Sequence, residues 1–148
     1  MSGGALATTL AVAAGRAGSI QVAVMSRLGE RVGVLEALAF SSVLAAAIAL
    51  VALLVVRQSL GGIERSAHQP WWMLTGGVLS MLIVFTVTYA GPRIGVAATI
   101  GVIIAAQLVM GAAIDRFGLF GSQQIGLHWY RLLGIALLGL GAALSLRK

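Results

Sequence analysis

Three long runs without a charged side chain constrain this chain more than any other feature of its sequence. Residues 37–56, 71–90 and 94–114 contain no Asp, Glu, Lys or Arg. An α-helix needs about 20 apolar residues to cross the hydrocarbon core of a bilayer, and each run has that length. We therefore expect three transmembrane helices here, with Pro92 just ahead of the start of the third.

Two further runs contain one charge each and bring the expected number of membrane helices to about five. Residues 127–146 contain Arg131 and begin with aromatic rings that suit the headgroup level. Residues 5–26 contain Arg16 near their middle. Because residues 1–9 include no Lys or Arg, the first run lacks the basic start of a signal peptide, and we expect it to be a retained helix.

The amino-acid composition indicates that the chain is surrounded by lipid, and it predicts the fold class. The chain is 59% hydrophobic and 9% charged, whereas about 25% of residues are charged in a typical soluble domain. We therefore expect an all-α integral membrane protein with a single transmembrane domain over residues 1–148. Its helices are expected at about 5–26, 37–56, 71–90, 94–114 and 127–146, joined by connections too short for a domain outside the membrane.

Several classes of protein are excluded by residue type. The chain has no cysteine, and His68 and His128 are too far apart in sequence to suggest a metal site. Without a thiol nucleophile, a carboxylate pair or a metal cluster, we expect neither an enzyme nor a cofactor. The net charge of +6 comes mostly from residues that flank the apolar runs, so we expect contact with membrane lipid and no nucleic acid.

The flanking charges also bear on orientation in the membrane. With five spans, the basic residues divide almost evenly, four on one side and five on the other, so the usual excess on the cytoplasmic side is missing. The two sets are Arg57, Arg65, Arg116 and Arg131 against Arg27, Arg31, Arg93, Arg147 and Lys148. This balance predicts that the chain inserts in both orientations and forms an antiparallel dimer. Such an inverted pair can give a solute site at the membrane midplane access to each side in turn. In the alternative, a sister chain or lipid fixes one orientation.

A recognisable motif lies between the last two expected helices. It resembles the short five-helix YdcZ-like family of the drug/metabolite transporter superfamily, and further matches cover nearly the whole chain. The matching segments are Asp115-Arg116-Phe117-Gly118-Leu119-Phe120-Gly121, Arg131-Leu132-Leu133-Gly134, Gln107, Trp71-Trp72, Gly76-Gly77, Pro92-Arg93-Ile94-Gly95 and, more loosely, 21–29. The resemblance implies a bacterial inner-membrane half-transporter, whose larger relatives contain two such halves in tandem.

The chain departs from the family pattern at two positions. Met25 stands where relatives carry an asparagine in the first helix, and Val43 stands where they carry a glycine in the second. If that asparagine contacts the solute in relatives, the contact is missing here, and the substrate differs.

Arg16 is the leading candidate for a solute contact. A charge near the bilayer centre costs at least about 2.5 kcal/mol, and such residues usually face a cavity or a partner. Arg16 is eleven residues from Ala5, about 16 Å along a helix, which is far for its side chain to reach the headgroups. Helical spacing places Thr9 and Ser19 on the same stripe as Arg16. Snorkelling of the side chain is the alternative.

The positions of the acidic residues suggest which solute Arg16 would bind. None of the four carboxylates lies in the middle of an expected span, whereas the superfamily's small multidrug exporters, by resemblance, use a glutamate in the first helix. A central guanidinium without a central carboxylate favours an anionic solute, because its planar fork suits carboxylates. Alternatively, Arg16 pairs with a carboxylate of a partner subunit and has a structural role.

Two glutamines inside expected spans are further candidates for binding a small-molecule substrate. Gln21 and Gln107 can each donate and accept hydrogen bonds, and Gln107 shares a helical stripe with Gly111 and Asp115. Interhelical hydrogen bonds are an equally good explanation for both glutamines.

Two features are expected to be mainly structural. Asp115 and Arg131 flank a glycine-containing turn and could form an ion pair that locks or gates it. Small residues in the last helix favour close helix pairing, either with a second copy or within one chain. They are Gly139, Gly141, Ala143 and Ser145.

Together these features predict a dimeric secondary transporter of a small metabolite or drug-like solute, with an anionic solute favoured. Its site would be formed by the first and fourth membrane helices. A small dual-topology ion channel and a nonconducting membrane scaffold are the two alternatives. Measured flux separates them, because carriers saturate, channels do not and scaffolds conduct nothing.

Overall fold

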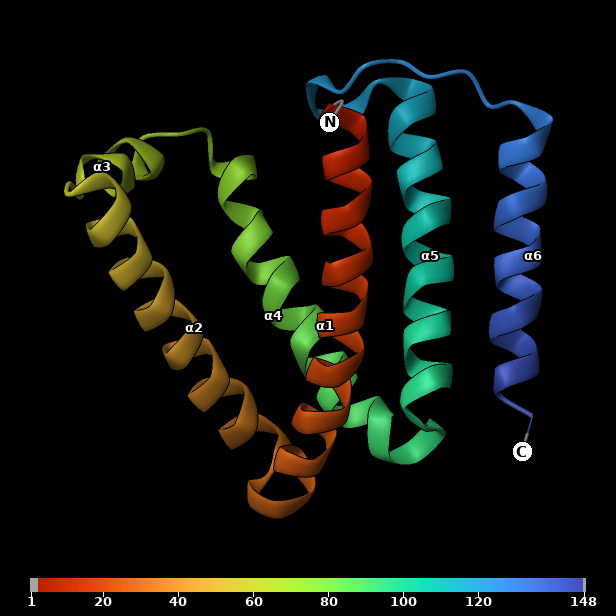
Figure 1. Cartoon of the computed structure of the whole chain (residues 1–148), viewed down its shortest axis with the longest axis horizontal. Coiled ribbons are helices and arrows are strands. Elements are labelled where there is room, and N and C mark those ends of the chain that lie inside the picture. Colours follow the sequence, from red (N-terminus) through yellow and green to blue (C-terminus); the bar gives the residue numbers. More distant parts are fainter. Residues whose placement is uncertain (1–2, 148) are drawn as a thin grey trace. The chain divides into compact units, whose positions relative to one another are not determined.

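The computed structural model describes residues 3–147 and contains no strand in that range. Its elements, in chain order, are α1 (Gly3–Val32), α2 (Val34–Arg57), α3 (Gly61–Ala67), α4 (Trp71–Ile94), α5 (Val96–Phe117), the 3-10 turn η1 (Leu119–Gly121) and α6 (Trp129–Ser145) (Figure 1). The expected all-α fold is confirmed. Lys148, counted above among the basic flanking residues, lies outside the described range.

Three of the helices are long and apolar enough to cross a bilayer: α2, α4 and α5. The shorter helix α6, with 17 residues, is also apolar. At 30 residues, α1 is long enough to span, but it carries Arg16 in its middle and Arg27, Glu30 and Arg31 in its last turns. These charges explain why α1 is less hydrophobic than the other long helices.

The long helices reverse direction at single glycines. Gly33 separates α1 from α2 with φ 104° and ψ 151°, and Gly95 separates α4 from α5 with φ 90° and ψ 154°. These backbone conformations are almost restricted to glycine. The connections expected at 27–36 and 91–93 are therefore one residue long, and Pro92 lies in the last turn of α4 and not ahead of a new helix.

The two reversals share a local sequence. Gly29-Glu30-Arg31-Val32-Gly33-Val34 matches Gly91-Pro92-Arg93-Ile94-Gly95-Val96 at four identical positions, with Val32 replaced by Ile94. A buried hydroxyl side chain precedes each segment by three residues, Ser26 in α1 and Thr88 in α4. Similar short sequences thus produce the same helix–glycine–helix connection twice.

Residues 24–92 form one compact unit, in which the end of α1 packs against the end of α4. Ser26 Oγ donates a hydrogen bond of 3.5 Å to the carbonyl oxygen of Val87. Gly29 lies so close to Thr88 that a Cβ added at Gly29 would stand 2.5 Å from Thr88 Cγ2. Thr88 is fully buried. Close backbone approach at a glycine is a common way for membrane helices to pack.

Residues 3–23 and 93–147 belong to the second unit, where α5 and α6 pack side by side (Figure 1). The closest approach is between Gly101 and Ala142, because a Cβ added at Gly101 would lie 3.4 Å from Ala142 Cα. An ion pair between Asp115 and Arg131 joins the last turn of α5 to the first turn of α6. One small residue and one ion pair thus fix the two ends of this contact.

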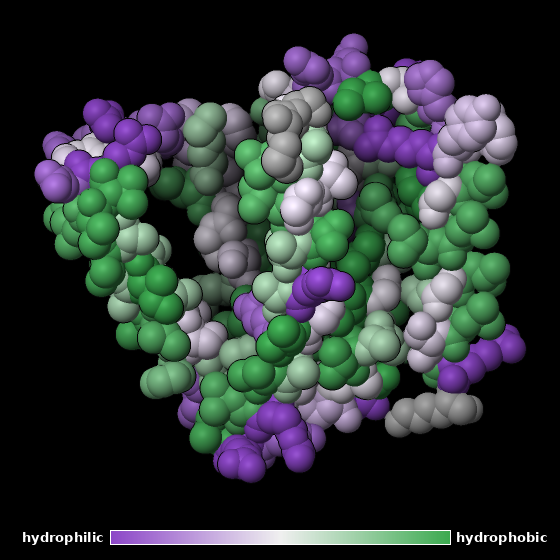
Figure 2. Space-filling view, in the orientation of Figure 1, coloured by the Kyte–Doolittle hydropathy of each residue, from purple (hydrophilic) through white to green (hydrophobic). Residues whose placement is uncertain are grey.

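Few apolar side chains are buried within the chain itself. Half of the eight buried apolar residues in the described range are alanines, and side chains such as Val43, Val56 and Leu10 are 71%, 77% and 61% exposed. Figure 2 shows hydrophobic side chains along α2 and α6, with hydrophilic ones gathered near helix ends. Such surfaces are stable in lipid, where apolar side chains gain nothing by leaving the hydrocarbon. The expected integral membrane protein is confirmed.

Candidate functional site

Arg16 lies on an exposed face of α1. Thirteen residues separate it from Gly3, the first described residue of the helix, which corresponds to about 20 Å at 1.5 Å per residue. Every residue from 3 to 21 is exposed except the half-buried Gly18. Almost all side chains in the first five turns of α1 are therefore exposed.

An open space of about 580 Å³ lies along one face of α1 beside Arg16, and we call it the Arg16 hollow. Its wall combines one cation, two hydroxyl groups and a set of small or branched apolar side chains. The lining residues are Thr8, Thr9, Val12, Ala13, Arg16, Ala17 and Ile20. All seven residues belong to α1, so the space is bounded on one side only and would become an enclosed small-molecule site only if another helix covered it.

The two hydroxyl groups of the Arg16 hollow are already used as donors. Thr8 Oγ1 donates to the carbonyl oxygen of Gly4 and Thr9 Oγ1 to that of Ala5, both at 2.9 Å. Each hydroxyl oxygen still has lone pairs that accept hydrogen bonds. The hollow can therefore bind a solute through the charge of Arg16 and through these acceptors at the same time.

Arg16 forms no ion pair among residues 3–147, and the positions of the four carboxylates explain why. Glu30 pairs with Arg27 at 3.1 Å near the end of α1, and Asp115 pairs with Arg131. Glu36 folds over Gly33 at the start of α2. Glu64 lies in α3. The charge of Arg16 is therefore balanced only by something from outside these residues.

Three other residues were predicted to bind the solute. Ser19, Gln21 and Gln107 are exposed, and none of the three lines it. Ser19 Oγ donates to the carbonyl oxygen of Gly15 at 3.1 Å. The side chains of Gln21 and Gln107 form no hydrogen bond within the described range, so both amides can still bind a partner or a solute. Their role in binding stays a prediction.

The Asp115–Arg131 pair closes the connection between α5 and α6. Arg131 Nη2 donates to Asp115 Oδ2, and both side chains are about one third exposed. The carbonyl oxygen of Asp115 also accepts a 2.9 Å hydrogen bond from the backbone N–H of Ile125. Gly118 and Gly121, expected to suit a tight reversal, both have positive φ, 63° and 76°. Whether the pair acts as a gate stays a prediction.

The four small residues predicted for close pairing are not those at the closest approach of α6 to α5. That contact uses Ala142, which is buried, whereas Gly141, Ala143 and Ser145 are exposed. Added Cβ atoms at Gly139 and Gly141 would meet nothing within 4 Å. Contact of this face with a second copy stays a prediction.

Sequence reasoning missed the contact between α1 and α4 and the hollow's first threonine. The sequence places Ser26 on the Arg16 stripe and makes Thr88 only a weaker binding candidate, without bringing their helices together, and it does not single out Thr8. A comparison of the chain with itself would have found the first two, since both precede a repeated glycine-arginine segment by three residues. Thr8 had no comparable signal, because a hydroxyl beside its own helix usually bonds that helix.

A family model described as "Putative inner membrane exporter, YdcZ" matches residues 6–144, nearly the whole chain. The chain belongs to the YdcZ family. YdcZ membership identifies it as a multi-pass inner-membrane protein and supports a role as a membrane transporter. The match includes Arg16, the Asp115–Arg131 pair and both helix reversals. No curated protein and no solved structure gives a significant match to the chain.

Proposed function

We propose that this YdcZ-family chain is one half of a dimeric secondary transporter for a small organic anion. The observation that carries the proposal is Arg16, a permanent charge in the middle of α1 that no carboxylate of residues 3–147 balances. Buried charges in membranes are stable when they pair or face water, so a bound carboxylate or phosphate would complete the site. A guanidinium binds either group through two parallel hydrogen bonds.

A second copy is the partner that fits best. The residues around Arg16 are exposed in the single chain, and an arginine facing lipid directly would be unfavourable. A second copy or a sister half would cover this face and turn the open hollow into an enclosed site. The balanced flanking charges of the sequence support an antiparallel pair, in which inverted halves alternate access to a midplane site.

Solute binding to Arg16 also suggests how access would alternate. In the dimer, the anion would lie between two copies of α1, with Thr8 and Thr9 oxygens accepting hydrogen bonds from its polar groups. The Asp115–Arg131 pair would hold the α5–α6 connection rigid while the helices around the solute rearrange. The solute would lower the energy of the closed arrangement because its negative charge lies between the two guanidinium groups and reduces their mutual repulsion.

The test is transport by purified protein in liposomes, with radiolabelled mono- and dicarboxylates as probes. We expect saturable uptake by the wild type and loss of most uptake in Arg16→Gln. We expect partial uptake in Arg16→Lys, because lysine keeps the positive charge but cannot form the two parallel hydrogen bonds of a guanidinium group. Arg31→Gln is a matched control that removes an arginine from the end of the same helix. Equal uptake by Arg16→Gln and the control would contradict the proposal.

Two further measurements separate the alternatives. Flux that rises without saturation would indicate a channel, and a protein without flux or ligand-induced stabilisation would be a scaffold. Tags on both termini report orientation, and equal labelling of each tag from both sides of the membrane is expected for dual topology. A single orientation of every copy would exclude the antiparallel homodimer and leave a sister half as partner.

A further inference from the structure

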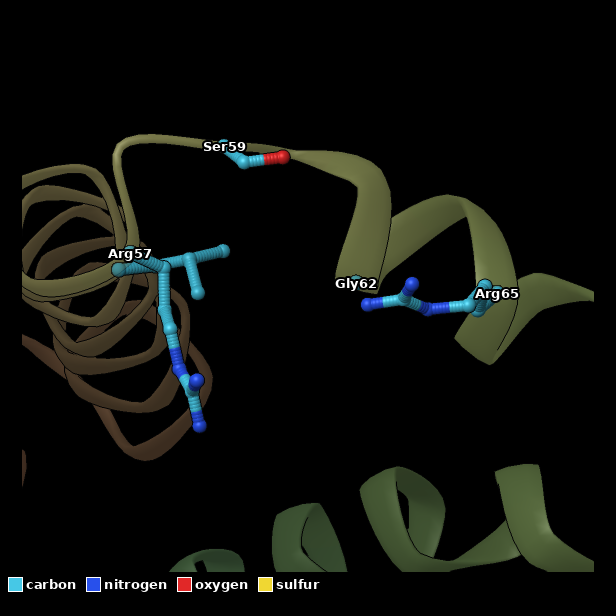
Figure 3. A pocket seen from close by; sticks show the side chains of 5 residues that line it. Arg57, Ser59, Gly62 and Arg65 are labelled. Carbon is cyan, nitrogen blue, oxygen red and sulfur yellow. The ribbon is translucent and has the colours of Figure 1, made fainter.

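A second polar pocket lies within residues 24–92, between the last turns of α2 and the short helix α3. We call it the α2–α3 pocket. It has a volume of about 430 Å³ and two arginines in its wall (Figure 3). The lining residues are Leu53, Arg57, Ser59, Gly62 and Arg65. Neither the family match nor the proposed transport cycle assigns a role to this pocket.

The turn between the two helices brings these residues together. Helix α2 ends at Arg57, and Gln58 takes the left-handed conformation with φ 51° and ψ 25°, which reverses the chain. Ser59 Oγ then accepts a 3.2 Å hydrogen bond from the backbone N–H of Gly61. On α3, Arg65 follows Gly62 by three residues and so lies on the same face. The pocket is thus built by ordered backbone on both sides.

The pocket has a net positive charge. Arg57 and Arg65 form no ion pair within residues 3–147, and Figure 3 shows them on opposite sides of the open space. Glu64, the nearest carboxylate in sequence, does not line the pocket, since it follows Gly62 by two residues and projects from another side of α3. Two like charges around one hollow attract an anion that can accept hydrogen bonds from both.

We propose that the α2–α3 pocket binds a phosphate group, with an anionic phospholipid headgroup as its ligand. Arg57 ends a helix long enough to span the membrane and Trp71 begins the next, which places the pocket at headgroup depth. Guanidinium groups bind phosphate oxygens bidentately. Leu53, one turn inside α2, supplies an apolar floor for the glycerol and the start of the acyl chains.

The experiment compares lipid retention by the full chain in native mass spectrometry, after transfer from phosphatidylcholine nanodiscs containing phosphatidylglycerol. We expect wild type to retain phosphatidylglycerol and Arg57→Gln/Arg65→Gln to retain roughly 10- to 30-fold less. The control Arg27→Gln/Arg31→Gln removes the same charge elsewhere and should retain nearly as much as wild type. Equal loss in both double variants would overturn the proposal, because the binding would then depend on charge alone.

Two other variants test the pocket itself. A Cβ added at Gly62 would meet nothing within 4 Å, so Gly62→Leu fills the pocket while keeping both arginines, and it should lower retention. Arg57→Lys/Arg65→Lys keeps the charge without the planar forks and should retain an intermediate amount. Wild-type retention in either variant would overturn the proposal.

A last comparison identifies the source of the phosphate. Release of bound phosphatidylglycerol by inorganic phosphate would show that the pocket also accepts phosphate from solution. Continued retention in its presence would show that the headgroup of the lipid is the ligand. In both cases Arg57 and Arg65 bind a phosphate group. Solute uptake is measured separately, so failure of this proposal would leave the transport function untouched.

Discussion

Replacing Gly29 by alanine tests the contact between α1 and α4 most directly. The new Cβ would lie 2.5 Å from Thr88 Cγ2, whereas ordinary contacts of this kind measure 3.4–4 Å, so the two groups must separate by about 1 Å. Thr88 cannot simply turn away, because it is fully buried and its hydroxyl donates to the carbonyl oxygen of Val84 at 2.7 Å. The helices must therefore move apart.

The expected cost follows from two opposing terms. Overpacking a tight interface costs typically about 1–3 kcal/mol, and replacing a helical glycine by alanine returns up to about 1 kcal/mol. We expect Gly29→Ala to lower the free energy of unfolding by about 1–2 kcal/mol. Gly77→Ala in α4 is the matched control, because its Cβ would meet nothing within 4 Å.

A second substitution makes this prediction specific. Thr88→Ser removes the clashing methyl group and keeps the hydroxyl, and the next atoms would then lie 3.6 Å or more from the new Cβ. We expect Gly29→Ala/Thr88→Ser to recover most of the lost stability, giving a coupling energy of about 1–2 kcal/mol in a double-mutant cycle. The assay is reversible unfolding in detergent micelles. If Gly29→Ala is as stable as Gly77→Ala, or if serine gives no recovery, the described packing is wrong.

Three other outcomes follow from the same structure. Gly33→Ala should destabilise the chain by about 1–3 kcal/mol, because φ 104° with ψ 151° is nearly closed to alanine; unchanged micellar unfolding would contradict this. Asp115→Asn should raise protease cleavage of the connection between α5 and α6, because it removes the ion pair with Arg131. The exchange Asp115→Arg/Arg131→Asp should restore protection. Cleavage unaffected by either change would show that the ion pair does not hold this connection. Gly101→Leu should separate α5 from α6 and lower the thermal midpoint, whereas an unchanged midpoint would count against the contact with Ala142.

The sequence by itself determined the class of this protein and the approximate positions of its helices. Hydropathy over about 20 residues is a local property, so residues 37–56, 71–90 and 94–114 identify α2, α4 and α5 without any knowledge of their neighbours. The family motif around Asp115 is also local, and it leads to the same transporter family as the match over the whole chain.

The helix ends were harder to predict, since they depend on backbone conformation and not on hydropathy. Charged residues near Arg31 suggested a loop, yet α1 continues to Val32 because Gly33 alone can make the reversal. Pro92 suggested a helix start, yet it lies in the last turn of α4. Membrane helices tolerate such a proline when surrounding groups satisfy the freed carbonyl.

Only the tertiary structure decided which side chains meet. The sequence identified Arg16 as an unusual charge, because an arginine in an apolar run is costly wherever the helix packs. The contact of Gly29 with Thr88 and the α2–α3 pocket depend on distances between segments that no local pattern specifies, whereas the residues of the Arg16 hollow share one face of α1 by helical spacing alone. In lipid, apolar side chains gain little by association, so close steric fit and single polar contacts decide how the helices pair.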